Sequence, residues 1–137
     1  MQYSELAGNL GLRVAVPYIA AASGAAGGGN LVCPGALQIV SATWTANATV
    51  TGQATNFVTL SFFNRTTGAG TIQWATAIAY SSGGVVATKA TPVTLTLSST
   101  ATDLQPALGD VLAVEITTTG TGLTVPGGIV EINARFR

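Results

Sequence analysis

The sequence predicts an all-β protein: an antiparallel β-sandwich of about eight strands, which we expect to be a jelly roll, with an extended N-terminal arm. Two observations predict this class. Apolar and polar side chains alternate with a period of two along several segments between residues 36 and 136. Gly-, Asn- and Thr-containing breaks separate these segments, and none has the period of a long amphipathic helix. One-sided alternation is typical of antiparallel sheets packed face to face.

The first expected strand lies near the N-terminus, where a period-2 pattern places apolar side chains at Leu10, Leu12, Val14 and Val16. Pro17 ends this pattern. Residues 20–30 are a low-complexity run of Ala, Gly, Ser and Asn, which in isolation forms a flexible linker. We therefore divide the chain into an N-terminal arm and linker, residues 1–30, and a β-sandwich domain, residues 31–137.

The sandwich strands follow from the alternation, and we expect them at residues 36–45, 57–64, 72–80, 93–97, 112–117 and 130–136. Short strands are also expected near residues 49–52 and 85–88, and one helical turn within 101–107. The phase changes at Ile39–Val40, which indicates a bulge or a strand buried on both faces. Seven strands would also fit an immunoglobulin-like sandwich, although the paired cysteines of the antibody version are missing.

Charge is the most unusual feature of the composition. The chain has five Lys or Arg, five Asp or Glu and no His, so its formal net charge is zero. Charged residues make up 7% of the chain, against about 25% in an ordinary soluble domain. Five cations balanced by five anions cannot build a basic face for nucleic acid, and the lack of His excludes His-based catalysis and metal binding. Such a surface favours a protein whose faces are covered by neighbouring subunits.

The single cysteine and the apolar runs restrict the location of the chain. Cys33 can form neither an intrachain disulfide nor a Cys-rich zinc site. With no His to activate its thiol, we expect it to be a small buried hydrophobe in a protein made in a reducing cytoplasm. The longest apolar stretch, residues 14–22, is shorter than the ~20 residues of a membrane-spanning helix, so no membrane partner is expected.

Few side chains are candidates for catalysis or metal binding. Glu115 and Glu131 lie on the polar faces of consecutive strands and could be near neighbours, as glycoside hydrolysis requires. Because both are expected to face solvent, with Arg135 on the same face as Glu131, a structural role is favoured. Asp103 and Asp110 lie seven residues apart in a loop, too few oxygens to indicate Ca²⁺. We expect no catalytic, cofactor or metal site.

Several segments from residue 35 onward occur in a familiar order. They are residues 49–59 followed by LSFFNR at 60–65, the Gly/Thr turn at 66–71, VTLTLS at 93–98, GDVL at 109–112, the Gly/Pro hairpin at 119–128 and a closing strand at 129–137. In this order they resemble the jelly-roll decoration (cement) proteins on the heads of tailed bacteriophages. The first 30 residues lie outside the resemblance.

The resemblance implies a structural virion protein that is not an enzyme and uses no cofactor. Such a protein sits on the capsid exterior as a homotrimer and bridges subunits of the major capsid protein to stabilise the head. For the arm we expect partner binding, as a strand added to the chain's own sheet edge or to a neighbouring subunit. The residues expected to make this contact are Leu10, Leu12, Val14, Val16, Tyr18 and Ile19. A monomer with residues 1–30 folded onto its own sandwich would count strongly against this reading.

Two alternative functions remain open. One is another β-rich virion component, such as a head fibre, neck or tail protein. The other is a carbohydrate-binding or adhesive sandwich, in which Trp44, Trp74, Tyr80 and Tyr18 would stack on sugars. Aromatic residues on alternating strands more often belong to the core. The sugar-binding alternative therefore needs an exposed aromatic platform.

Overall fold

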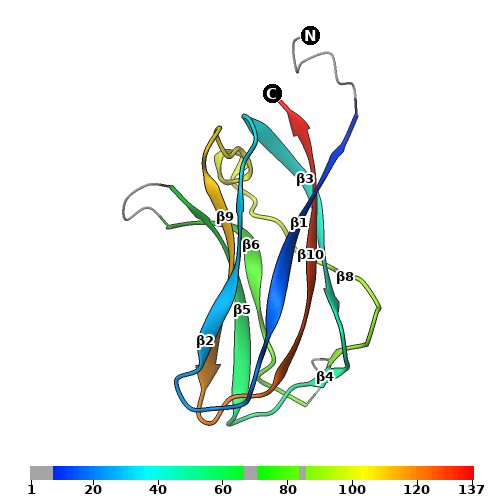
Figure 1. Cartoon of the computed structure of the whole chain (residues 1–137), viewed down its shortest axis with the longest axis vertical. Coiled ribbons are helices and arrows are strands. Elements are labelled where there is room, and N and C mark those ends of the chain that lie inside the picture. Colours follow the sequence, from blue (N-terminus) through cyan, green and yellow to red (C-terminus); the bar gives the residue numbers. More distant parts are fainter. Residues whose placement is uncertain (1–7, 67–70, 84–85) are drawn as a thin grey trace.

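The computed structural model describes residues 8–66, 71–83 and 86–137, and it forms two four-stranded antiparallel sheets packed face to face (Figure 1). The predicted class, an all-β antiparallel sandwich, is confirmed. The first sheet has the order β1 (Leu10–Ile19), β10 (Val125–Phe136), β3 (Leu37–Ala46), β8 (Val93–Thr94). The second has the order β2 (Ala26–Val32), β9 (Val111–Thr119), β5 (Phe57–Arg65), β6 (Thr71–Ala79). A separate short pair joins β4 (Val50–Thr51) and β7 (Val86–Ala87).

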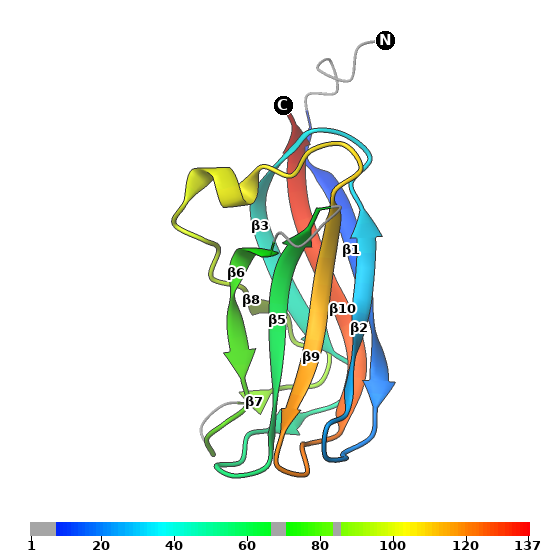
Figure 2. The same cartoon turned by 90° about the vertical axis from the view of Figure 1, so that its left-hand side faces the viewer.

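The strands pair in a nested arrangement. β5 pairs with β6, β4 with β7, β3 with β8, β2 with β9, and β1 with β10, all antiparallel. Each strand before the β5–β6 connection therefore pairs with the strand equally far after that connection. Figure 2 shows the second sheet in front, with β1, β10 and β3 behind it. The chain crosses between the sheets from β1 to β2 and again from β2 to β3.

Local predictions from the alternation agree well with these strands. The two short strands near residues 49–52 and 85–88 are β4 and β7, and the helical turn is a 3-10 helix, η2 (Ala101–Leu104). The predicted bulge is confirmed, because Asn133 pairs with Ser41 and Ala134 with Ile39, which leaves Val40 as the extra residue. The extra residue is exposed, as the change of phase requires.

The core lies between the inward faces of the two sheets. Its pattern is clearest in β5, where Val58, Leu60 and Phe62 are fully buried while the intervening side chains are partly exposed. Each such large apolar side chain contributes about 1.5–3 kcal/mol when it is removed from water. Phe62 also packs against Trp74, with ring centroids 5.3 Å apart. The largest fully buried side chains are Trp44, Trp74, Phe62, Leu37, Ile39, Leu60, Leu112, Ile116 and Ile132.

The predicted boundary between an arm and a sandwich at residue 30 is wrong. Residues 10–19 form β1, which pairs with β10 from Leu10–Ala134 to Ile19–Val125, and residues 26–32 form β2, which pairs with β9. The chain's own sheets therefore hold this segment. The physical reason is that β1 carries an apolar face and β10 offers it an unpaired edge, so the strand completes the sandwich of its own chain.

The Gly-rich run is also packed rather than a flexible linker. A Cβ atom added at Gly29 would lie 2.1 Å from the carbonyl oxygen of Ala15, and one at Gly27 would lie 2.6 Å from Cδ1 of Ile19. Only glycine lets β2 come this close to β1, and the approach closes one side of the sandwich between the two sheets. We call this the β1–β2 side.

The opposite side is closed by residues 93–98, and we call it the 93–98 side. This segment starts as β8 on β3, where Leu95 N donates to Ala42 O at 2.9 Å. It then crosses to β6, where Thr76 N donates to Thr96 O at 2.8 Å. The expected strand at 93–97 is thus divided between the two sheets, because a single segment serves the edges of both.

Candidate functional site

The six arm residues predicted to bind a partner do not form an exposed stripe. Val14 and Val16 are buried, and Leu10, Leu12 and Ile19 are partly buried against the same core. Only Tyr18 is largely exposed, at 66%. In this chain five of the six are therefore covered by its own sandwich, as in the first of the two expected arrangements, in which the strand is added to the chain's own sheet edge. A period-2 pattern indicates that one face will be buried, but it does not say which chain buries it.

The two glutamates on consecutive strands are not neighbours. Glu115 lies on β9 in the second sheet and Glu131 on β10 in the first, and both are partly exposed, so they belong to opposite outer faces of the sandwich. Each has its own arginine: Arg65 Nη2 lies 2.7 Å from Glu115, and Arg13 Nε lies 3.1 Å from Glu131. Because β9 and β10 lie in different sheets, the two glutamates cannot form the paired-carboxylate geometry of a glycosidase.

The Arg65–Glu115 pair is the best-formed polar cluster on the outer face of the second sheet. Two parallel hydrogen bonds of 2.7 Å join the guanidinium to the carboxylate. These hydrogen bonds raise the pKa of Arg65. The guanidinium carbon also lies 4.9 Å from the centroid of the Phe63 ring. Sequence reasoning missed this cluster because it needs the register of β5 on β9, which alternation alone does not give.

Asp103 and Asp110 act in separate local networks. Asp103 accepts a hydrogen bond of 2.6 Å from Ser98 Oγ. Asp110 Oδ2 accepts hydrogen bonds from Asn64 Nδ2 and from the backbone N of Ala107, both at 2.9 Å. Within the described ranges, no group of three His, Cys, Asp or Glu side chains could hold a metal ion. Turn formation is the role that these contacts support.

Asn64 is a buried polar residue that sequence reasoning did not single out. It is 3% exposed, and its Oδ1 has no hydrogen-bond partner among the residues that the structure describes, while its Nδ2 donates to Asp110. A signal for its burial was present, because Asn64 continues the inward positions of Val58, Leu60 and Phe62. A buried acceptor without a donor lowers stability, so this amide is a weak point where β5 ends.

The single cysteine is buried, as predicted. Burial, together with the negative charge of Asp110, raises the pKa of the Cys33 thiol to about 11. The thiol is therefore protonated at neutral pH, and it lacks the thiolate character that a nucleophile or metal ligand needs.

Three of the four aromatic residues considered for sugar stacking are inside the protein, and the fourth, Tyr18, is exposed. Trp44, Trp74 and Tyr80 are each no more than 2% exposed. Trp44 Nε1 donates to the hydroxyl of Tyr80 at 3.1 Å, and Trp74 Nε1 donates to the carbonyl oxygen of Phe63 at 3.1 Å. The three rings are buried and the indole N–H groups of the two tryptophans are hydrogen-bonded inside the protein. These rings therefore stabilise the core and offer no platform to a sugar.

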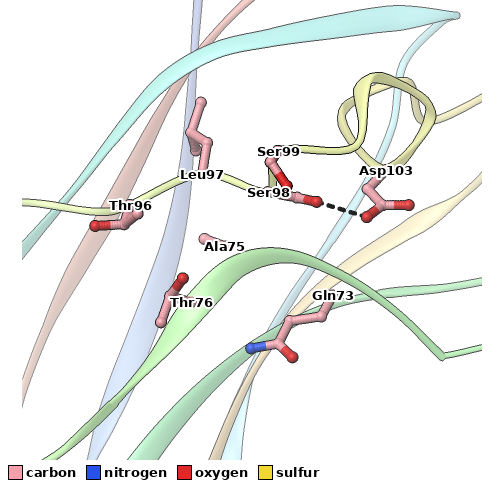
Figure 3. A pocket seen from close by; sticks show the side chains of 8 residues that line it. All are labelled: Gln73, Ala75, Thr76, Thr96, Leu97, Ser98, Ser99 and Asp103. Carbon is pink, nitrogen blue, oxygen red and sulfur yellow. Dashed lines mark hydrogen bonds between the residues drawn. The ribbon is translucent and has the colours of Figure 1, made fainter.

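A groove with a volume of about 560 Å³ lies at the 93–98 side (Figure 3). Its lining residues are Gln73, Ala75, Thr76, Thr96, Leu97, Ser98, Ser99 and Asp103. In Figure 3 the only bond drawn is the one from Ser98 to Asp103. Ser98 Oγ also accepts from Thr100 N at 3.1 Å, so this hydroxyl closes the turn before η2. A serine and a carboxylate without an intervening imidazole form a weak nucleophile, and the lining has no cation for an oxyanion.

Several large apolar side chains are exposed on the part of the surface that the structure describes. Leu108 is 73% exposed, and the other large exposed ones are Tyr18, Val32, Val40, Ile72, Val86 and Ile129. Ile129 lies on the outer face of the first sheet between Ala15 and Thr45. Val32 directly precedes Cys33, and Leu108 directly precedes Gly109, whose N donates to the carbonyl oxygen of Cys33. These positions are available for contacts with other protein surfaces.

Comparisons with known proteins gave no match to a family model, to a curated protein or to a solved structure. Among the residues described, there is also no helix long and apolar enough to cross a membrane. The function is therefore argued from the chain's own residues.

Proposed function

We propose that this chain is a structural virion protein: a decoration or cement protein that binds the outside of a tailed-phage head as a homotrimer and bridges major capsid subunits. The observation that carries the proposal is the charge-poor surface. Ten charged residues share 7016 Å² of accessible surface. Four of them, Arg13, Glu131, Arg65 and Glu115, neutralise one another in pairs. A protein of this kind would be located on the capsid exterior after synthesis in the host cytoplasm.

The nested strand pairing supports the jelly-roll part of the proposal. A jelly roll can be described as one long antiparallel hairpin rolled into two sheets, built from two Greek keys. The pairing of β1 with β10, β2 with β9, β3 with β8 and β5 with β6 follows that scheme. Jelly rolls are frequent in viral capsid proteins, lectins and cupins. Burial of the aromatic rings removes most of the support for a lectin, and a His-based cupin metal site has no ligands in a chain without His.

The position of the N-terminal segment weakens one argument for assembly. Residues 10–32 lie in the chain's own sheets, so a free arm no longer supports the decoration proposal. The proposal rests instead on the surface, where neutral outer faces and scattered exposed apolar residues favour contacts made by apolar burial. Such contacts need no charge complementarity, and they weaken little when salt is raised.

The test is binding to heads of the parent phage that lack this protein. We expect purified protein to be a trimer by light scattering and to occupy the capsid exterior in electron cryomicroscopy, at positions that touch more than one capsid subunit. Raising the salt concentration should leave occupancy unchanged. Leu108→Lys and Ile129→Lys each place a charge on an exposed apolar position, and at least one should lower occupancy, while Thr117→Lys serves as the control at an exposed polar position.

Other results would overturn the proposal. A ring of six or twelve copies at the neck or tail would identify the protein as another virion component. A monomer that does not bind heads would remove the decoration function altogether.

A further inference from the structure

β1 is an edge strand that a short, exposed connection joins to the rest of its chain. Residues 20–24 are exposed and Ala25 is partly buried. Two hydrogen bonds hold this connection: Ala25 N donates to Ala22 O at 3.2 Å, and Thr118 Oγ1 donates to Ala25 O at 3.1 Å. Since so little fixes residues 20–25, the connection can change direction at low cost.

β1 can leave its sheet without breaking the strand pairing of β2. β1 pairs with β10 in the first sheet, whereas β2 pairs with β9 in the second. The two strands touch through glycine contacts such as Gly29 against Ala15. Removal of β1 would therefore open one edge of one sheet and leave the second sheet intact.

The slot left by β1 would need another strand to fill it. Val14 and Val16 are 1% and 4% exposed, so their removal would uncover the apolar core and the backbone edge of β10. Two contacts match the slot to the sequence of β1. Gly29 leaves room for the backbone of β1 to come close, and Glu131 forms an ion pair with Arg13. The strand that fits without any change of contact is β1 from a second copy of the chain.

We propose that β1 is an exchangeable strand, which in the assembled protein pairs with β10 of a neighbouring copy. This inference rests on the proposed homotrimer, because exchange requires neighbouring copies. The contacts of β1 are the same within one chain and between two, so only the path of residues 20–25 differs. Assembly raises the effective concentration of neighbouring β1 strands, which favours exchange.

The test uses two single-cysteine variants of the full chain, Arg13→Cys and Glu131→Cys, expressed together and oxidised after purification. These residues are direct partners on the outer face of the first sheet, and cross-strand partners meet the distance requirement of a disulfide. Exchange predicts a covalent heterodimer as the main oxidised product on a non-reducing gel. Cys33 can stay in place, because its buried thiol is protonated under the conditions of oxidation.

The matched control pairs the same Glu131→Cys variant with Thr43→Cys. Thr43 is the partner of Glu131 on the other side of β10, and β3 lies inside its sheet, so it is not exchanged. This mixture should give no heterodimer above random collision. The double variant Arg13→Cys/Glu131→Cys in one chain reports the alternative, since pairing within the chain yields an oxidised monomer.

The outcomes separate the two proposals. A trimer by light scattering that gives only oxidised monomer from the double variant, and no heterodimer from the mixture, overturns strand exchange and leaves the homotrimer standing. A monomer by light scattering overturns the homotrimer and the exchange together. A heterodimer from the Arg13→Cys mixture that is absent from the Thr43→Cys mixture establishes the exchange.

Discussion

The two sides of the sandwich are closed in different ways. At the β1–β2 side, two strands from opposite sheets approach through glycine, with Gly29 against the backbone of Ala15. At the 93–98 side, one continuous segment is hydrogen-bonded first to β3 and then to β6. The comparison teaches that the open edges of two packed sheets can be covered in two ways. Glycines without side chains let the edge strands come close, or one segment forms hydrogen bonds with the edges of both sheets.

The largest effect is expected at the β1–β2 side. Gly29→Val puts a side chain where a Cβ would lie 2.1 Å from a backbone oxygen, so β1 must move away. We expect the free energy of unfolding to fall by about 3 kcal/mol in urea titration, the upper end of the usual cost of overpacking. Gly11→Val is the matched control, because Gly11 lies on the neighbouring edge strand β1 with nothing within 4 Å of its added Cβ. An unchanged stability of the Gly29 variant would show that this side is not tightly packed.

A smaller but clear loss is expected at the 93–98 side. Leu95 is 4% exposed where the segment leaves β3. Leu95→Ala removes buried methyl groups and should lower the free energy of unfolding by about 2–3 kcal/mol. Hydrogen exchange of the Thr76 amide, which bonds to Thr96, should accelerate in this variant. Unchanged protection of that amide would mean that the segment is held by its hydrogen bonds alone.

Alkaline pH should weaken both sides through buried neutral groups. Burial raises the pKa of Cys33, which follows β2, to about 11, and burial also raises the pKa of Tyr80, which follows β6. Each pKa is higher in the folded than in the unfolded state, so the stabilisation is complete below the unfolded pKa and is lost as pH rises toward the folded one. For Cys33 this window runs from about 9 to about 11.

Cys33→Ala and Tyr80→Phe should each remove part of this alkaline loss. The measurement is the thermal midpoint as a function of pH for the wild type and both variants. A wild-type midpoint that is constant up to pH 11 would contradict the burial of both groups in solution.

The smallest effect is expected from the surface ion pair of β1. Arg13 and Glu131 are 71% and 42% exposed in their side chains, and their single contact is 3.1 Å long. Glu131→Gln should change the free energy of unfolding by less than about 0.5 kcal/mol, measured by urea titration at low salt. A larger loss would show that charge, and not only packing, holds β1 on β10.

Much of the fold was predictable because it depends on local pattern. The alternation in β5 placed its buried residues, and the phase change placed the bulge at Val40. The position of each strand in one sheet or the other was not predictable from local pattern, so the separation of Glu115 from Glu131 was missed. For the same reason the local pattern indicates a flexible Gly-rich linker, whereas Gly27 and Gly29 in fact allow β2 to pack closely against β1.

The predicted interaction residues show the same limit. An apolar face such as that of Val14 and Val16 must be buried, but alternation does not distinguish the chain's own core from that of a neighbour. The cluster of Arg65, Glu115 and Phe63 depends on strand register, which the sequence pattern leaves open. The burial of Asn64 could be predicted from the sequence, because this residue continues the series of inward-facing positions in β5.

The nested pairing also determines when the sandwich can be completed during synthesis. β1 is synthesised well before its partner β10, which is made more than a hundred residues later, as the pairing of Leu10 with Ala134 shows. Pairing between such distant segments closes a large loop, so folding is slow and most of it follows translation. Throughout that interval β1 keeps its apolar face uncovered. Nascent chains on one polysome would therefore be close enough for the β10 of one chain to compete for the β1 of another.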